Sequence, residues 1–299
     1  MQPGGMEEQM LVSRGYSRDG ASVPAETLLR WGRDELERAG IAVVESRWLL
    51  EWALGEPLGT RTNVGIRAAE KYRSAIFQRR AHIPLQHITR EMTFRYLTLR
   101  AGPGVFIVRP ETEMLVDLAL ETLGAGNAKV ADLCAGSGAI GLALASERKD
   151  TCVTMVEINP IAGRYLEANA RGTAPFAPGS TVAIRMEDAT RGLSGWEESL
   201  DMVVSNPPYV GVADAPEQPE ALADPQTALY GGGEDGLVTP RGIVTRAHAL
   251  LRGGGTLLME HGEKQGAALV DHAANVGFSA EETLEDLTGR PRFLKAVKQ

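Results

Sequence analysis

The chain has 299 residues and a hydrophobic content of 43%, which is enough to fill the cores of one doubly wound domain and a smaller domain. Its formal net charge of −8 at pH 7 argues against a surface that grips duplex nucleic acid, and no stretch is long and apolar enough to span a membrane. Because the N-terminus also lacks a signal-peptide core, we expect a cytoplasmic protein, most simply a monomer, with no membrane partner and no direct nucleic-acid partner.

The amino-terminal part is predicted to be a short extension followed by a helical domain. Residues 1–22 are rich in Gly, Ser and Met and are expected to be an untethered tail. Residues 23–85 form the helical domain, whose first helix starts at Pro24. Apolar residues recur along this helix at helical spacing: Leu28, Leu29 and Leu36.

Two further helices complete the predicted helical domain. Trp48, Leu49 and Trp52 make the apolar face of a helix that ends at Gly55, and this spacing indicates that the tryptophans belong to the core. The third helix spans about residues 68–80. Its arginines are interpreted as a solvated helix face, with a local basic patch as the alternative: Arg73, Arg79 and Arg80.

Residues 86–108 are predicted to be a β-hairpin linker. One strand covers residues 94–100 and the other residues 105–108, and they are joined through Gly102-Pro103-Gly104. The larger domain follows at residues 109–299.

This larger domain opens with Arg109-Pro110-Glu111-Thr112-Glu113. These residues suit a helix start, because proline is favoured near the first turn and acidic side chains are favoured by the helix dipole. The segment is equally placed to border a binding pocket, and the two roles are compatible.

A glycine-rich turn lies within residues 130–141, where a buried strand passes into a helix. Gly136 and Gly138 let the backbone approach a ligand closely, and the amino end of the helix favours a carboxylate. The next strand, residues 152–156, ends in Glu157, about 20 residues beyond the glycines, where an acidic side chain can bind both hydroxyls of a ribose. Both NAD and S-adenosylmethionine fit this pairing.

Two more strands carry polar residues at their carboxyl ends. The strand at residues 182–186 ends at Glu187-Asp188, which is placed to reach an adenine amino group. The apolar run at residues 202–204 leads into Asn206-Pro207-Pro208-Tyr209. An Asx turn before a loop is one interpretation of these four residues.

A second interpretation of this N-P-P-Y segment is chemical. The two prolines hold Asn206 rigidly, because each fixes its own φ and lacks an N–H. The Asn206 amide oxygen and the Pro207 carbonyl can then accept two hydrogen bonds from one planar NH2 group and stabilise positive charge that develops on its nitrogen. Tyr209 is expected to close the site as an aromatic wall. With the other strand ends, this favours an S-adenosylmethionine-dependent N-methyltransferase over a dehydrogenase.

Several motifs occur in an order that resembles the HemK-type family. They are V-F-I-V-R-P-E-T-E from Val105, D-L-C-A-G-S-G-A-I-G from Asp132, N-P-P-Y, G-G-G-E-D-G-L from Gly231 to Leu237, and E-H-G from Glu260 with Gln265. Members of this family methylate the side-chain amide nitrogen of the glutamine in the Gly-Gly-Gln motif of peptide chain release factors. The resemblance extends from about Ala25 to the C-terminus. The chain departs from the family pattern at Val108 and Arg90, where proline and glycine are usual.

The resemblance implies an α/β fold, namely a Rossmann-like class I S-adenosylmethionine-dependent methyltransferase beside a small N-terminal helical domain. The sheet is expected to have seven strands with the last one antiparallel, completed by an apolar hairpin near residues 283–287 and 293–297 that provides an antiparallel edge. The implied cofactor is S-adenosyl-L-methionine, the implied partner is a release factor, and no metal is expected.

The resemblance also assigns site residues. On the cofactor side they are Asp132, Cys134, Ala135, Gly136, Ser137, Gly138, Glu157, Asp188, Ala189 and Asn206. On the acceptor side they are Arg109, Glu111, Thr112, Asn206, Pro207, Pro208 and Tyr209, of which the last four are expected to be catalytic.

The remaining candidate residues suggest structural roles. Cys134 and Cys152 each fall on a predicted central strand, so we expect buried reduced thiols rather than a disulfide. His261 is expected to be a hydrogen-bonded structural residue, because the five histidines show no metal-ligand spacing. Alternative acceptors are adenine in DNA, which would require base flipping, a ribosomal-protein glutamine or a natural product. A non-catalytic cofactor-binding module is a further alternative.

Overall fold

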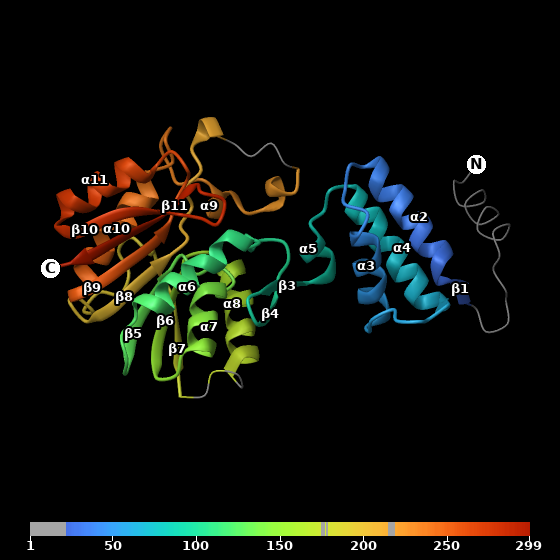
Figure 1. The fold of residues 1–299 in the computed structure, drawn as a ribbon, viewed down its shortest axis with the longest axis horizontal. Coiled ribbons are helices and arrows are strands. Elements are labelled where there is room, and N and C mark those ends of the chain that lie inside the picture. Colours follow the sequence, from blue (N-terminus) through green and yellow to red (C-terminus); the bar gives the residue numbers. More distant parts are fainter. Residues whose placement is uncertain (1–21, 175–176, 178, 215–218) are drawn as a thin grey trace. The chain divides into compact units, whose positions relative to one another are not determined.

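A computed structural model of the chain describes residues 22–174, 177, 179–214 and 219–299. The chain divides into two compact units, the first ending at Thr89 and the second beginning at Arg90 (Figure 1). No helix of the described residues is long and apolar enough to cross a lipid bilayer. The predicted N-terminal extension lies outside the described residues except for Ser22, which pairs with Gly65 in a short strand.

The first unit is a small helical bundle capped by a two-stranded sheet. Its elements are β1 (Ser22–Pro24), α2 (Ala25–Arg38), α3 (Glu45–Leu54), β2 (Asn63–Gly65), α4 (Ile66–Arg80) and α5 (Leu85–Thr89). The predicted helix start at Pro24 and the helix end at Gly55 are confirmed, and Gly55 adopts the left-handed conformation expected of a helix-ending glycine. Leu28, Leu36 and Leu49 are buried in its core.

Two expectations for this unit were wrong. Trp48 is 50% exposed, because the adjacent Leu49 and Leu50 occupy the buried face of α3. Arg79 does not belong to a solvated face; it is buried, and its Nε donates to Glu45 Oε2 at 2.6 Å. Burial of the arginine is tolerated because the carboxylate accompanies it.

The second unit contains a seven-stranded sheet in the order β10-β11-β9-β8-β5-β6-β7. Its strands are β5 (Ala128–Leu133), β6 (Thr151–Glu157), β7 (Thr181–Met186), β8 (Leu200–Ser205), β9 (Leu251–Glu260), β10 (Phe278–Glu285) and β11 (Pro291–Lys298). The last strand, β11, is antiparallel to both neighbours, as expected. It lies one position in from the edge rather than at the edge, because β10 forms the outer strand.

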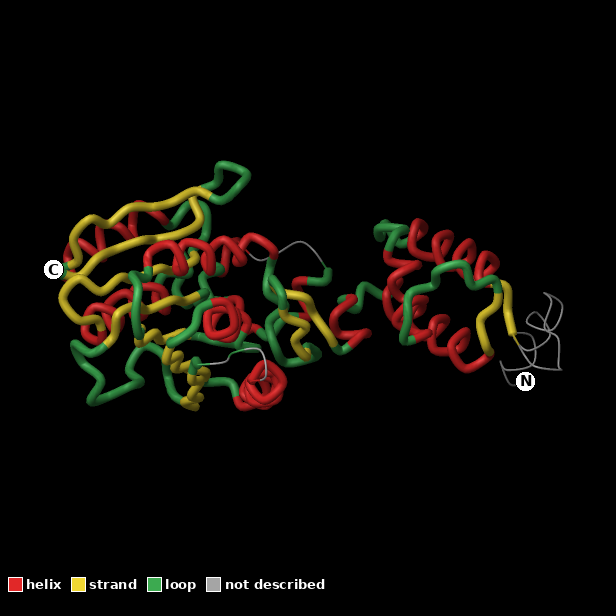
Figure 2. Tube along the Cα trace, turned by 60° about the horizontal axis from the view of Figure 1, so that its bottom comes forward, coloured by secondary structure: helices red, strands yellow, loops and turns green. Residues whose placement is uncertain are grey.

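Helices cover both faces of this sheet (Figures 1 and 2). They are α6 (Glu113–Thr122), α7 (Ala139–Glu147), α8 (Pro160–Thr173), α10 (Val238–Leu250) and α11 (Gly266–Val276). The connecting segments carry the short helix α9 (Gln226–Leu229) and the 3₁₀ turns η1 (Pro110–Thr112), η3 (Val212–Asp214) and η4 (Ala221–Ala223). Leu115, Leu142 and Leu166 from α6, α7 and α8 share one apolar cluster, whereas Val244 and Leu269 from α10 and α11 belong to the other. The unit is therefore a three-layer α/β domain.

The linker hairpin differs from its prediction. Its strands are β3 (Glu91–Phe94) and β4 (Leu97–Arg100), and the chain reverses at Arg95, whose φ is 51°. Arg95 is fixed there because its Nε donates to Glu147 Oε1 at 2.6 Å. Residues 105–108 form no strand; the Ile107 N–H donates to the buried Asp224 carboxylate at 3.1 Å instead.

The two cysteines are free thiols, and only Cys134 is partly buried. Cys152 is exposed, contrary to expectation, because it is the second residue of β6 and lies at the amino end of the strand. Cys134 is half-buried and follows the last residue of β5.

Candidate active site

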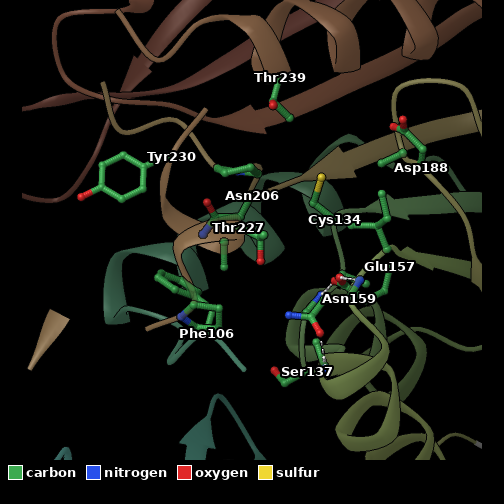
Figure 3. A pocket seen from close by; sticks show the side chains of 18 of the residues that line it. Phe106, Cys134, Ser137, Glu157, Asn159, Asp188, Asn206, Thr227, Tyr230 and Thr239 are labelled. Atoms are coloured by element: carbon green, nitrogen blue, oxygen red, sulfur yellow. Dashed lines mark hydrogen bonds between the residues drawn. The ribbon is translucent and has the colours of Figure 1, made fainter. Parts of the chain in front are cut away.

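A cavity of about 640 Å³ lies at the carboxyl ends of four parallel strands of the second unit. Its wall brings together the residues that follow each strand: Cys134, Ala135, Gly136 and Ser137 after β5, Glu157 and Asn159 at β6, Asp188 and Ala189 after β7, and Asn206 and Pro208 after β8. In an open α/β sheet this is the edge at which ligands bind. In Figure 3, Glu157, Asn159 and Ser137 lie at one side of the cavity, and Asn206, Thr227 and Tyr230 at the other.

The glycine-rich turn shapes the first side of the cavity. Gly138 has a φ of 85° and is the N-cap of α7, so the chain turns sharply from strand to helix. A Cβ at this position would lie 2.5 Å from the Leu166 side chain. Ser137 lines the cavity, and its buried hydroxyl has no hydrogen-bond partner among the described residues. A buried hydroxyl of this kind is suited to bind a polar ligand.

Glu157 is held by the backbone on either side of it. One carboxylate oxygen accepts from the Gly136 N–H at 2.7 Å and the other accepts from the Asn159 N–H at 2.7 Å. Each carboxylate oxygen has a further lone pair, so the group can still accept from a diol. Figure 3 shows Glu157 beside Asn159 at the cavity wall.

Asp132 and Asp188 have different positions relative to the cavity. Asp188 lines it, and hydrogen bonds from Thr190 and Arg191 hold the pKa of its carboxyl below the usual range. Asp132, predicted to bind the cofactor directly, lies fully buried beneath the glycine turn instead, where Oδ2 accepts from the Gly141 N–H at 2.9 Å. Burial raises the Asp132 pKa to about 7.

Asn206 lies at the other side of the cavity, tied to a chain of side chains. Its Nδ2 donates to the Thr112 hydroxyl at 3.2 Å, and the Thr112 hydroxyl donates to Glu260 Oε2 at 2.7 Å. The other oxygen of Glu260 accepts from the Tyr209 hydroxyl at 3.1 Å. No described residue donates to the Asn206 amide oxygen, so that oxygen is available to a ligand in the cavity.

Tyr209 does not line the cavity, although an aromatic wall was expected from it. Its ring is turned so that the hydroxyl reaches Glu260, and Tyr230 lines the cavity in its place. Pro207 is buried, and its carbonyl accepts no hydrogen bond from the described residues. Tyr230 was not predicted; it directly precedes the G-G-G-E-D-G-L run, which was the one signal near it in the sequence.

The backbone of the G-G-G-E-D-G-L run packs closely against the backbone of the N-P-P-Y segment. Gly236 has a φ of 69°, and a Cβ there would lie 2.2 Å from the Tyr209 carbonyl oxygen. Gln265 fastens the two segments, because its Nε2 donates to the Tyr209 carbonyl at 2.7 Å and to the Asp235 carbonyl at 2.8 Å. These contacts fix the N-P-P-Y backbone. They give the G-G-G-E-D-G-L run and Gln265 a structural role that the sequence alone did not indicate.

None of residues 109–113 lines the cavity, although Arg109, Glu111 and Thr112 were expected on its acceptor side. The Arg109 guanidinium pairs with the buried Asp224 carboxylate at 2.7 Å, and Glu111 is exposed. The residues just before this segment, Phe106 and Val108, do line the cavity.

Burial governs the electrostatics behind Asn206. Removal of Glu260 from water raises its pKa to about 7, although the hydrogen bonds from Thr112 and Tyr209 and the charge of Arg292 oppose the shift. Burial also raises the pKa of the Tyr209 hydroxyl and lowers that of His261. The His261 Nδ1 lies 2.8 Å from the Gly262 carbonyl, which agrees with a structural role. Across the described residues, no cluster of three His, Cys, Asp or Glu side chains is arranged to hold a metal ion.

Two family models match the chain. The Methyltransferase small domain matches residues 96–241, and the PrmC N-terminal domain matches residues 27–89. The two matches fall on either side of the division between the two compact units.

Curated relatives match this chain over most of its length and most of their own. The release factor glutamine methyltransferase of Bifidobacterium longum is 44% identical over 82% of this chain and 84% of its own. The protein of the same name from Streptomyces coelicolor is 39% identical, over 76% and 80%. That from Deinococcus radiodurans is 36% identical, over 90% and 96%.

Solved structures support the fold. A Thermus thermophilus ribosomal RNA methyltransferase in complex with AdoMet and guanosine has a TM-score of 0.50 and 24% identity, over 70% of this chain and 50% of its own. A methyltransferase from Pyrococcus furiosus has a TM-score of 0.50 and 16% identity, over 76% and 97%. The second unit therefore has the class I methyltransferase fold that the sequence predicted.

Proposed function

The chain belongs to the release factor glutamine methyltransferase family, and on that premise we propose that it transfers a methyl group from S-adenosylmethionine to the glutamine side-chain amide of the Gly-Gly-Gln motif in a release factor. The observation that carries the proposal is the position of Asn206. Its free amide oxygen lies in the wall of the same cavity as Glu157 and the glycine turn, so an amide NH2 and the cofactor can meet there.

The residues of the first side of the cavity fit S-adenosylmethionine. Glu157 would accept from the ribose hydroxyls, Ser137 offers a buried hydroxyl without a partner among the described residues, and Asp188 would accept from the adenine amino group. When bound, this cofactor supplies an electrophilic methyl group.

The protein contributes position and electrostatics to the acceptor. A glutamine amide nitrogen is a poor nucleophile, because its lone pair is conjugated with the carbonyl. The Asn206 amide oxygen and the Pro207 carbonyl would accept its two N–H groups, turn the nitrogen toward the methyl group and stabilise the positive charge that develops. Val108, Pro208 and Tyr230 would exclude water from the acceptor side chain.

We further propose that the first unit recognises the body of the release factor. The match of residues 27–89 to the PrmC N-terminal domain supports this role. Remote binding energy would then orient the reacting amide, so a free Gly-Gly-Gln peptide should be a far poorer substrate than the intact factor. The enzyme is proposed to act as a monomer in the cytoplasm, and light scattering of the purified protein tests the first part.

The decisive experiment is mass spectrometry of a cognate release factor incubated with this chain and S-adenosylmethionine. We expect one added methylene on the tryptic peptide that contains Gly-Gly-Gln, located on the side-chain nitrogen. An unmodified release factor together with methyladenine in duplex DNA would replace the substrate assignment. If both stay unmodified, the acceptor is a different molecule, and Val108 and Arg90 are the first positions to examine.

A further inference from the structure

We propose that Thr112 and Glu260 are positioning residues that decide which end of the Asn206 amide faces the acceptor. An asparagine amide has an accepting oxygen and a donating NH2 of nearly the same size, so a flip by 180° exchanges them with little change in shape. Only one of the two orientations accepts hydrogen bonds from an incoming NH2. The inference rests on the proposed function and adds to it the groups that set this orientation.

The direction follows from counting protons along the chain of hydrogen bonds. Above pH 7 Glu260 is mostly ionised and has no proton to give, so Thr112 at 2.7 Å and Tyr209 at 3.1 Å both donate to it. The Thr112 hydroxyl has a single proton and uses it on Glu260. Toward Asn206, at 3.2 Å, it can therefore offer only a lone pair.

Asn206 must therefore donate to that lone pair through its NH2 group. Its oxygen is then turned away from Thr112, toward the cavity that Asn206 lines. The flipped amide would set two acceptors against each other at Thr112 and would present an NH2 to the NH2 of the acceptor. Glu260 thus controls a group that it does not touch.

The surroundings keep this arrangement in place. Thr112 and Glu260 are fully buried, so water does not compete for their hydrogen bonds. Thr112 ends η1, Glu260 ends β9 and Asn206 follows β8, so each group is mounted on a regular element. Arg292 and Glu111 are the other charged groups that act on Glu260, and they act in opposite directions.

The test compares Thr112→Val, which keeps the shape and removes the hydroxyl, with Thr112→Ser, which keeps the hydroxyl. With intact release factor as substrate at pH 8, we expect kcat of Thr112→Val to fall at least about tenfold, with KM and the cofactor dissociation constant little changed, and Thr112→Ser to retain most of the activity. Thr98→Val, on the exposed side of β4, is the matched control and should behave as wild type.

A second readout follows the orientation itself. In the wild type, the Asn206 side-chain amide protons, assigned by their absence in Asn206→Ala, should be protected from solvent exchange, and Thr112→Val should remove that protection. If Thr112→Val unfolds, Thr112→Ala takes its place in the comparison with Thr112→Ser.

The outcomes separate the inference from the proposed function. Equal activity of Thr112→Val and wild type, or equal losses in Thr112→Val and Thr112→Ser, would overturn the positioning role while methylation by the wild type still stands. Failure of the wild-type protein to modify the release factor would overturn the proposed function, and unchanged amide exchange in Thr112→Val would then overturn the positioning role separately.

Discussion

The two sides of the cavity are held in place by different kinds of contact. On the cofactor side, Glu157 is fixed by two backbone N–H groups, which lie 21 and 2 residues away in the sequence. On the acceptor side, Asn206 is fixed by the side chain of Thr112, 94 residues away, and Thr112 by the side chain of Glu260, 148 residues away.

This difference has a consequence for how each side responds to substitution. A backbone donor survives replacement of its own side chain, so the cofactor side should tolerate a change at Asn159, one of the two residues that hold Glu157. A side-chain donor is lost with its side chain, so the acceptor side should fail when any of its supporting groups is removed. Four experiments test this contrast.

The largest effect is expected at the reacting end of the acceptor side. Asn206→Ala should lower turnover by roughly 10²–10³, the scale of one preorganised contact to developing charge, while cofactor binding stays largely intact. Single-turnover methyl transfer and calorimetry measure the two quantities. Asn127→Ala, at an exposed asparagine, is the control. Parallel losses of cofactor affinity and turnover would place Asn206 on the cofactor side and break the contrast.

The second effect is the pH dependence of the free energy of unfolding that arises from the buried Glu260 carboxyl on the acceptor side. The Glu260 pKa rises from 4.5 to about 7 on folding, so between these values the folded protein keeps a proton that the unfolded chain has released. Stability must then fall as the pH rises through this window, by about 3 kcal/mol from this residue. Denaturant unfolding of Glu260→Gln at pH 5 and pH 8 should show a smaller fall than wild type. Asp132 contributes a further part of the wild-type fall in the free energy of unfolding. Glu263→Gln, at an exposed position, is the control and should show the same fall as wild type.

The third effect lies on the cofactor side. Glu157→Ala should weaken S-adenosylmethionine binding by roughly 1.5–3 kcal/mol, the range for hydrogen bonds to a charged group. Calorimetry with Glu263→Ala as control measures it. An unchanged dissociation constant would remove Glu157 from the binding site.

The smallest effect is expected at Asn159, where the contrast between backbone and side-chain donors is tested most directly. Asn159 donates to Glu157 through its backbone, whereas its side chain caps α8 by accepting from the Ile161 and Ala162 N–H groups. Asn159→Ala should lower the free energy of unfolding by about 1 kcal/mol through loss of the cap, with little change in cofactor affinity. A large loss of affinity would mean that the side chain, not the backbone, serves the cofactor.

The same contrast explains which parts of the site could be predicted from the sequence. Glu157 and the glycine turn were found because they lie on consecutive strand and turn patterns. The link from Thr112 to Glu260 depends on β9 lying beside β8 and on η1 reaching both, and no local pattern encodes that. The sequence placed Thr112 at a predicted helix start and on the acceptor side, and Glu260 in a family motif, but it assigned no hydrogen-bond partner to either residue.

The fold shows a similar limit. Three helices of the first unit, α2, α3 and α4, followed from periodicity, and the seven-stranded sheet followed from the family resemblance. Trp48 and residues 105–108 did not behave as their local pattern suggests. Trp48 competes for the buried face of α3 with Leu49 and Leu50, which lie next to it. Residues 105–108 look like a strand, but Asp224, 117 residues beyond Ile107, takes the Ile107 N–H that a ladder would use. At residues 105–108, a tertiary contact therefore overrides a local preference.

The backbone crossing at Gly236 bears on how substitution data for this protein should be interpreted. A side chain there would collide with the Tyr209 carbonyl, and the positive φ would strain any other residue. A complete mutational scan scored by activity would therefore rank Gly236 beside Asn206, although Gly236 has no chemical group to offer. Intolerance to substitution would outline an active site larger than the set of atoms that meet the substrate, and a stability measurement on each inactive variant is what separates the two.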